Sequence, residues 1–320
     1  MSRPALLALL PLTLSPLCAA AQDLNVDFSN DGTAPPAIFA AAGSAGVWNA
    51  AHPLTFGPPV PLVDVNGAAT GVAVQNIFLN VAFSPLSDPT ITGDAATLLL
   101  GGWTTTDIPG RMRFSGLQQG SYDVFAYGLV PSQPTFGTSF ITLPGAGSCG
   151  GPFTGSFTEG VTHVHSRLTV NPGQNVDVDW TVGGPFGSFA IFSGIQIEQI
   201  WKSVGSGISG SAGVPTLQAL GTLEPTTTVQ VRAIDTAPSA PAWLVFGASQ
   251  LGLPLFGGTL VPSPDLVVPL TSSASGQVLF SQGWPAAVPA GLSTFWQCWI
   301  LDGGAVQGVA ATGGLTAISG

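Results

Sequence analysis

Charged residues are scarce in this sequence, and basic ones are the scarcest. Asp, Glu, Lys and Arg make up 7% of the 320 residues, with 6 basic against 16 acidic side chains. The formal net charge of −10 argues against nucleic acid or anionic lipid as a partner, because both are bound through basic surfaces.

Long apolar runs are also missing beyond residue 21, since Gly, Pro, Ser or Thr interrupts each one well before 18 residues. No transmembrane helix is therefore expected. Methionine occurs twice and Lys and Glu are rare, whereas the chain holds 43 Gly and 28 Pro. This composition disfavours helices and suits short strands joined by tight turns.

Cysteine is limited to three residues: Cys18, Cys149 and Cys298. Cys18 falls in the N-terminal segment discussed next, and the other two fall in different predicted domains. A disulfide between them would have to cross the domain interface, so two unpaired thiols are the expected arrangement. The sequence alone leaves both arrangements open.

The first 21 residues have the layout of a secretory signal peptide. Arg3 precedes an apolar run from Ala5 to Leu17, and three alanines end the segment. Cleavage after Ala21 would leave a mature chain of formal charge −11, because only Arg3 is lost. A lipoprotein anchored at Cys18 is the alternative, but Leu17 stands where a small residue is needed. The protein is expected to be secreted or held at the cell surface.

About 300 mature residues favour two domains. We expect a jelly-roll-like β-sandwich over residues 22–200, a linker over 201–213 and a small C-terminal β-sandwich over 214–320. The linker prediction rests on the small, flexible composition of residues 202–213. The fold class is therefore all-β, with two β-sandwich domains after a cleaved signal peptide.

Strands of the first domain are predicted from alternating apolar and polar residues. The alternation is clearest in five segments: 71–83, 122–127, 161–170, 176–182 and 188–197. One short helix is expected, capped by Asp94 and ending at Gly101 and Gly102. In the second domain, residues 294–301 are apolar on both faces, which predicts a central strand.

The segment RFSGLQQGSYDVFAYG, residues 113–128, resembles a strand-turn-strand signature of galactose-binding-like and related carbohydrate-binding jelly rolls. Leu117 and Tyr122 can pack beneath the turn, and Gly120 permits it. The residues GVWN at 46–49 and GIQI at 194–197 are similar to further segments of that group. The resemblance implies a fold and a carbohydrate-binding role, and it identifies no ligand residues.

The second half resembles an uncharacterised C-terminal module that recurs in secreted bacterial proteins. The matching segments are the Gly/Ser-rich entry at 205–213, the end of a strand at 245–249 and the closing stretch at 297–315. That family usually carries a cysteine in the entry, where this chain has Ile208. The resemblance implies export and an accessory role, with no partner for Cys298 inside the domain.

Two pairs of residues suggest a metal site. His163 and His165 are two apart on a predicted strand, so they project from one face, and Asp177, Asp179 or Glu159 could complete a ligand set. Asp177 and Asp179 also share one face and could act as paired acid and base. The alternative for both pairs is an ordinary solvated strand face.

Two arginines, three tryptophans and two turns are candidates for ligand binding. Arg111 and Arg113 could bind a carboxylated sugar or merely solvate an edge strand. Trp48, Trp103 and Trp284 lie near turns, where an exposed indole could stack on a sugar ring. Calcium could bind the turns Asn30-Asp31-Gly32 and Asp64 to Gly67, although turn formation alone explains both.

No nucleophile elbow, phosphate loop, dinucleotide fingerprint or zinc knuckle occurs. An exported, non-catalytic protein that binds carbohydrate or another cell-surface component is the leading hypothesis. A structural or adhesive surface component is the first alternative. The second is a metal- or carboxylate-dependent enzyme acting on polysaccharide, which requires His163, His165 and an acidic residue to converge in a concave site.

Overall fold

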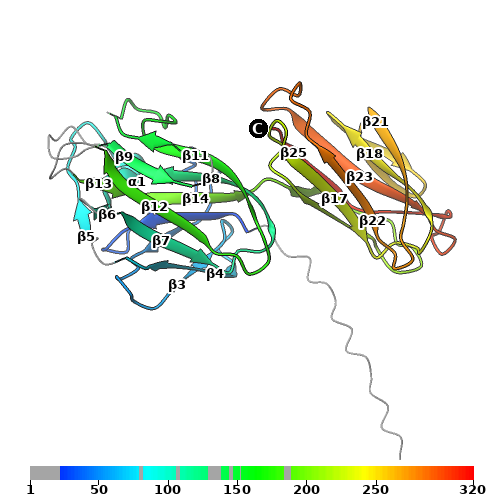
Figure 1. Cartoon of the computed structure of the whole chain (residues 1–320), viewed down its shortest axis with the longest axis horizontal. Helices are drawn as coiled ribbons and strands as arrows, with labels where there is room; N and C mark the ends of the chain where they lie inside the picture. The colour runs from blue at the N-terminus through cyan, green and yellow to red at the C-terminus, as the bar shows by residue number, and fades with distance from the viewer. Residues whose placement is uncertain are drawn as a thin grey trace, which may run out of the picture.

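A computed structural model describes residues 22–78, 82–105, 109–128, 138–143, 147–151, 153–183 and 189–320. The predicted signal peptide, residues 1–21, lies outside them. The described residues form 25 strands and one short helix (Figure 1). The all-β prediction is therefore confirmed.

The N-terminal half is a sandwich of two sheets (Figure 1). Sheet I consists, in spatial order, of β11 (His163–Val170), β8 (Gly120–Tyr127), β14 (Gly194–Gln199), β1 (Leu24–Phe28) and β2 (Trp48–Ala51). Sheet II consists of β10 (Ser148–Cys149), β9 (Thr138–Thr142), β12 (Val176–Gly183), β7 (Gly110–Ser115), β4 (Ala69–Asn76) and β3 (Val60–Val63). A small sheet III consists of β13 (Ala190–Phe192), β6 (Gly101–Thr105) and β5 (Ala82–Pro85).

Alternation along each strand fills the core between sheets I and II. Val164, Leu168 and Val170 of β11 point inward, as do Val178 and Trp180 of β12. The intervening residues point away from this core, because successive side chains of a strand lie on opposite faces. The outward residues of β8, β11, β7 and β12 are mostly polar, and they include most of the predicted site residues.

The helix α1 (Gly93–Leu99) covers part of the outer face of sheet I with its buried residues Leu98 and Leu99. It begins after Thr92, so the predicted cap at Asp94 is wrong: Asp94 lies inside the first turn. There its carboxylate is suited to the positive end of the helix dipole. Gly101 and Gly102 continue directly into strand β6.

The C-terminal half has its own sheets and its own core. Sheet IV contains, in spatial order, β15 (Lys202–Val204), β25 (Gly314–Ile318), β23 (Ser293–Leu301), β18 (Pro241–Gly247) and β21 (Leu266–Thr271), with β24 (Val309–Ala311) beside β23. Sheet V contains β16 (Thr216–Leu220), β17 (Thr228–Ile234) and β22 (Val278–Gly283), and a hairpin joins β19 (Gln250–Leu255) to β20 (Gly258–Pro262). Strand β23 is central and buried on both faces, as predicted.

The segment predicted to be a linker is folded onto the C-terminal half. β15 pairs with β25, Ile208 bridges to Ala311, and the backbone N–H of Ser211 donates to Asp302. No sheet of the described residues combines strands from both halves. The chain passes from one half to the other at Ile200 and Trp201, and the predicted division into domains at 201–213 stays a prediction.

Two further expectations concern cysteines and membranes. Cys149 and Cys298 are both buried and unpaired, as expected for thiols on the two sides of a domain boundary. Among the described residues, no helix has the length and apolar character needed to cross a bilayer.

Candidate functional site

The outer face of sheet II carries two consecutive Arg–Asp pairs between β7 and β12. The strand register places Arg113 opposite Asp177 and Arg111 opposite Asp179. Each guanidinium meets its carboxylate through two parallel hydrogen bonds, at 2.8 and 2.8 Å for Arg113 and with Nη2–Oδ2 at 2.6 Å for Arg111. The hydrogen bond from Arg113 lowers the pKa of Asp177. Bidentate pairing of this kind fixes the planes of both groups.

Further side chains extend this face across β9 and β4. Thr142 lies opposite Asp179, and Gln75 lies opposite Arg113. Phe140 projects from β9 with 43% of its surface exposed. Its ring lies against Gly183 of β12, where a side chain would collide with it. We call these outward residues of sheet II the ladder face: Gln75, Arg111, Arg113, Phe140, Thr142, Asp177, Asp179 and Thr181.

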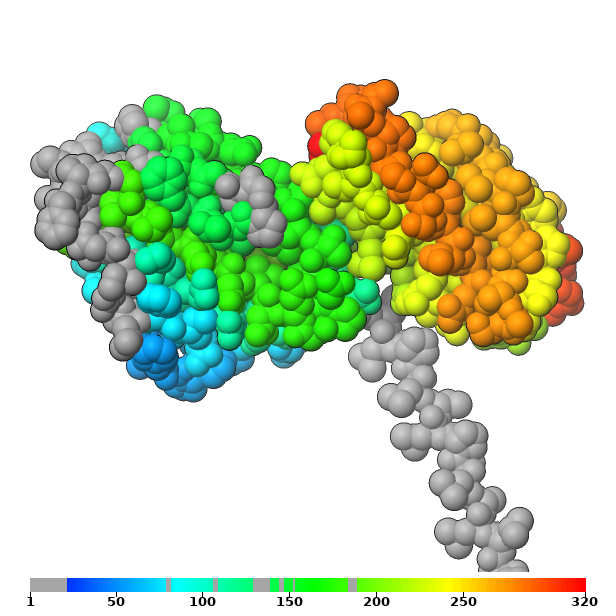
Figure 2. Space-filling view, viewed as in Figure 1, coloured from blue at the N-terminus to red at the C-terminus, as the bar shows by residue number. Residues whose placement is uncertain are grey.

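The ladder face is open and shallow. The side chains of Arg111 and Arg113 are each 38% exposed, and those of Asp179 and Asp177 are 26% and 30% exposed. Figure 2 shows the N-terminal half as a broad surface without a deep hollow over β7 and β12. Both partners of each pair therefore present unused hydrogen-bonding capacity to solvent while their positions are already fixed.

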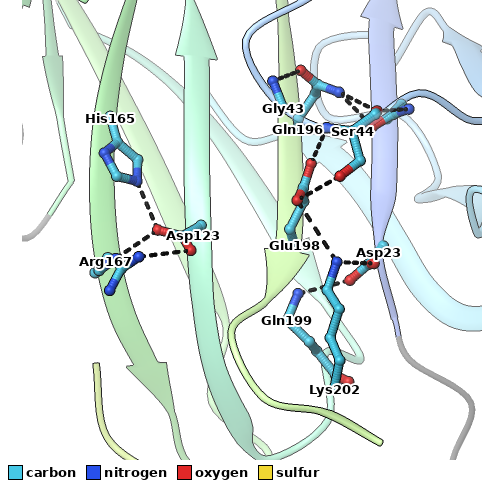
Figure 3. A network of polar contacts seen from close by, with 11 residues as sticks. Asp23, Gly43, Ser44, Asp123, His165, Arg167, Gln196, Glu198, Gln199 and Lys202 are labelled. Carbon is cyan, nitrogen blue, oxygen red and sulfur yellow. Dashed lines mark hydrogen bonds and ion pairs between the residues drawn. The ribbon is translucent and has the colours of Figure 1, made fainter. Parts of the chain in front are cut away.

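The outer face of sheet I carries a group of polar side chains on β8 and β11. His165 Nε2 lies 2.7 Å from Asp123 Oδ1, and Arg167 donates to the same carboxylate (Figure 3). Phe125 stacks on the His165 ring at 4.6 Å with an interplanar angle of 9°. The Asp123 carboxylate is thus already bound by two side chains.

His163 lies deeper on the same face. It is 5% exposed and packs beside Phe125 and Tyr127. Burial, and then the neighbouring His165, lower the pKa of His163 to about 4. The ring is therefore neutral near pH 7, enclosed, and bonded through Nδ1 to Thr162 Oγ1 at 3.2 Å.

The predicted metal ligands do not meet. His163 and His165 lie on the outer face of sheet I, whereas Asp177 and Asp179 lie on the outer face of sheet II. Glu159 is exposed and forms only an isolated backbone bridge to His163. No group of three or more His, Cys, Asp or Glu suited to a metal occurs in the described ranges. The histidines and aspartates are separated because their strands belong to different sheets, a fact that residue spacing does not encode.

A second network on sheet I surrounds Glu198. Its carboxylate accepts hydrogen bonds from the backbone and hydroxyl of Ser44, and Lys202 bridges it to Asp23 (Figure 3). Gln196, two residues before Glu198 on β14, donates to the side chain of Asn25 and to the Ser44 carbonyl. These contacts hold the loop before β2 onto the sheet, so the role of the network is to stabilise the fold.

The tryptophans expected near the surface are buried. Trp48 is 6% exposed and donates through its indole N–H to the Phe39 carbonyl, Trp103 is 4% exposed and Trp284 is 6% exposed. Each one packs against a core cluster instead of standing on the turn next to it. Phe140 is an exposed ring that can meet a ligand, as are Phe56 and Phe256 elsewhere on the surface. Alternation along β9 places Phe140 on the face opposite to the buried Ile141.

In the two turns predicted as calcium sites, an aspartate side chain accepts hydrogen bonds from the turn itself. Asp31 accepts from Ser29 and from both donors of Thr33, and these bonds lower the pKa of Asp31 to about 2. Asp64 accepts from the backbone N–H groups of Asn66 and Ala68. Both arrangements are Asx turns, which stabilise a chain reversal without an ion.

Asp27 is a buried acidic residue that the sequence pattern does not single out. It lies on β1 between Gly194 and Ala50, is 1% exposed, and neither carboxyl oxygen has a hydrogen-bond partner. Burial, followed by the nearby Asp31 charge, raises the pKa of Asp27 to about 8. The sequence carries no signal for this burial, because Asp27 takes a polar position in the alternation of β1, together with Asn25. A carboxyl group enclosed in this way is stabilised in its neutral form.

The chain was compared with protein families, curated proteins and solved structures. No protein-family model matches the chain, and no curated protein matches it. A structure of Sulfolobus turreted icosahedral virus is 12% identical with a TM-score of 0.23, over 80% of this chain and 61% of that one. The Endo-D glycoside hydrolase domain of Streptococcus pneumoniae R6 is 10% identical (TM-score 0.21, 80% and 39%), and a Bacteroides uniformis β-glucuronidase is 11% identical (0.18, 77% and 32%).

The chain thus spans less than two thirds of the length of these solved structures. Some neighbours are carbohydrate-active enzymes, but TM-scores near 0.2 carry no functional argument. The two family resemblances of the sequence remain predictions.

Proposed function

We propose that this protein is an exported, non-catalytic binding protein whose ladder face holds an extended, hydroxyl-rich polymer such as a polysaccharide. The observation that carries the proposal is the alignment of the Arg111–Asp179 and Arg113–Asp177 pairs in consecutive rows beside the exposed Phe140 ring. Export rests on the signal-like residues 1–21.

The chemistry of the ladder face suits sugars. A hydroxyl group both donates and accepts, so one sugar can donate to Asp179 and accept from Arg111 at the same time. The pairs keep their planes fixed, which reduces the ordering cost of binding. Phe140 offers an apolar face to the C–H surface of a sugar ring, as aromatic side chains with an exposed face do.

Affinity electrophoresis of residues 22–320 tests the proposal. Gels would contain a β-glucan, a xylan, a galactomannan or a polygalacturonate, and wild type would be run beside Phe140→Ala. Phe256→Ala is the matched control, because Phe256 has a similar exposed fraction, 48%, but lies in the C-terminal half. Retardation that is lost in Phe140→Ala and kept in Phe256→Ala supports the proposal, and equal mobility in all gels contradicts it.

One observation favours a second function, a structural or adhesive role at the cell surface. The ladder face is open, and Phe140 is the only large exposed aromatic ring among the eight residues that define it. An open face of this kind also suits lateral contact with a surface layer. Retention of wild type on isolated cell envelopes, unchanged by competing soluble polysaccharide and by Phe140→Ala, would favour this role.

A further inference from the structure

The connection between the two halves is hydrogen-bonded to both of them. Ile200 and Trp201 are 5% and 8% exposed and belong to the core cluster of the C-terminal half. The N–H of Ile200 donates back to Ser121 of β8 at 2.8 Å, and the indole N–H of Trp201 donates forward to Gly221 at 2.9 Å. Both residues of the connection are therefore buried and hydrogen-bonded, so neither is free to act as a hinge.

A second contact lies beside the crossing. The backbone N–H of Gly221 donates to the hydroxyl of Ser121 at 2.8 Å, in a buried position. Ser121 Oγ is also 3.0 Å from Thr169 Oγ1 of β11. The C-terminal half is thus hydrogen-bonded directly to β8 of sheet I, at a hydroxyl that Thr169 of β11 also contacts.

Arg167 makes the most extensive contact at this position. Its side chain is 8% exposed and is held by Asp123, with Nε–Oδ1 at 2.8 Å (Figure 3). The remaining nitrogen, Nη1, donates to the carbonyls of Thr222 and Ile318, both at 2.9 Å. These carbonyls belong to segments almost 100 residues apart in the C-terminal half, so one guanidinium fixes that half at two points.

We infer that Arg167 fastens the two sandwiches into one rigid body. Domains joined by a short connection and a modest polar interface ordinarily move relative to each other. Here a positively charged donor, oriented by a carboxylate of one half, satisfies two carbonyls of the other, and charge-assisted hydrogen bonds are the strong ones. Removing the guanidinium would leave Asp123 with His165 alone and would take the Arg167 donor away from both carbonyls.

Small-angle scattering and calorimetry of residues 22–320 test this inference. Arg167→Met keeps much of the apolar stem and removes the donors. Arg113→Met is the matched control, because Arg113 also pairs bidentately with a cross-strand Asp, and both of these hydrogen bonds lie within its own half. We expect wild type and Arg113→Met to scatter as one compact particle and to unfold in a single transition. Arg167→Met should show a larger maximum dimension and two transitions.

Ser121→Ala is the second variant, in case Arg167→Met fails to fold by circular dichroism. It removes the acceptor of the Gly221 N–H and leaves the Arg167 contacts in place, so it should widen the scattering profile less. Scattering and unfolding of folded Arg167→Met that match those of wild type would overturn the inference. So would two transitions in wild type, or an Arg113→Met profile as extended as that of Arg167→Met.

Discussion

The ring of Phe140 lies against the α-carbon of Gly183 on the neighbouring strand, so closely that a Cβ at position 183 would stand 1.7 Å from a ring carbon. Phe140 pairs in register with Thr181, and its ring therefore leans two residues along β12. Glycine at position 183 is what allows the ring to lie flat on the ladder face.

Gly183→Ala should displace the Phe140 ring and weaken polysaccharide binding about tenfold, which corresponds to about 1.4 kcal/mol. The fold should persist, because the collision is with an exposed ring. Titration calorimetry with the polysaccharide retained best in gels checks this. Gly283→Ala is the control, since a Cβ there meets nothing within 4 Å. Unchanged affinity in Gly183→Ala would remove Phe140 from the binding face.

Asp27→Asn should change how stability depends on pH. Because burial raises the pKa of Asp27 to about 8 from 3.8, the folded state keeps a proton that the unfolded state releases. Stability is therefore lost as pH rises from about 4 to about 8, at no more than about 1.4 kcal/mol per pH unit. The variant should unfold at higher denaturant concentration than wild type at pH 8, with the difference shrinking toward pH 4. Parallel curves across this range would contradict the assignment.

His163→Phe should act in the opposite direction at lower pH. The pKa of His163 is lowered to about 4 from 6.5, so the unfolded state takes up a proton that the folded state refuses. Wild type loses this contribution as pH falls from about 6.5 toward 4. The stability of the variant relative to wild type should thus rise over that window and stay flat above it. Urea titrations at half-unit pH steps measure the difference, and a flat difference throughout would disprove it.

Cys149 and Cys298 should resist alkylation in the folded protein. Burial raises the pKa of each thiol to about 12, and the thiolate is the reactive form. Iodoacetamide at pH 8 should label neither residue without denaturant and both in 6 M guanidinium, as counted by intact-protein mass. Rapid labelling of either residue in the native protein would place it at the surface.

Strand faces could be predicted from the sequence, but strand neighbours could not. The alternation in 161–170 and 176–182 places His163 with His165, and Asp177 with Asp179, on one face of each strand, as the structure has them, although His163 is buried there. Which strands lie side by side depends on long-range pairing, so the partnership of β12 with β7 was invisible. The candidate metal site failed for this reason, and the Arg–Asp rows went unnoticed although all four residues had been singled out.

Segment composition was a weaker guide than alternation. Residues 202–213 have a linker's composition, yet a strand and several hydrogen bonds hold them to the C-terminal half. Trp48 and Trp103 stand next to turns but fill core positions. Nearness to a turn does not determine where a large side chain points, because burial of the ring is decided by the packing around it.

The central claim is that the ladder face binds polysaccharide, and a glycan array probed with residues 22–320 tests it most directly. Wild type and Phe140→Ala would be applied side by side, with calcium and then with a chelator. The account predicts specific binding by wild type, loss of that binding in Phe140→Ala, and no effect of the chelator, because Asp31 and Asp64 already accept hydrogen bonds within their own turns. A blank array for wild type, or equal binding by the variant, would contradict it.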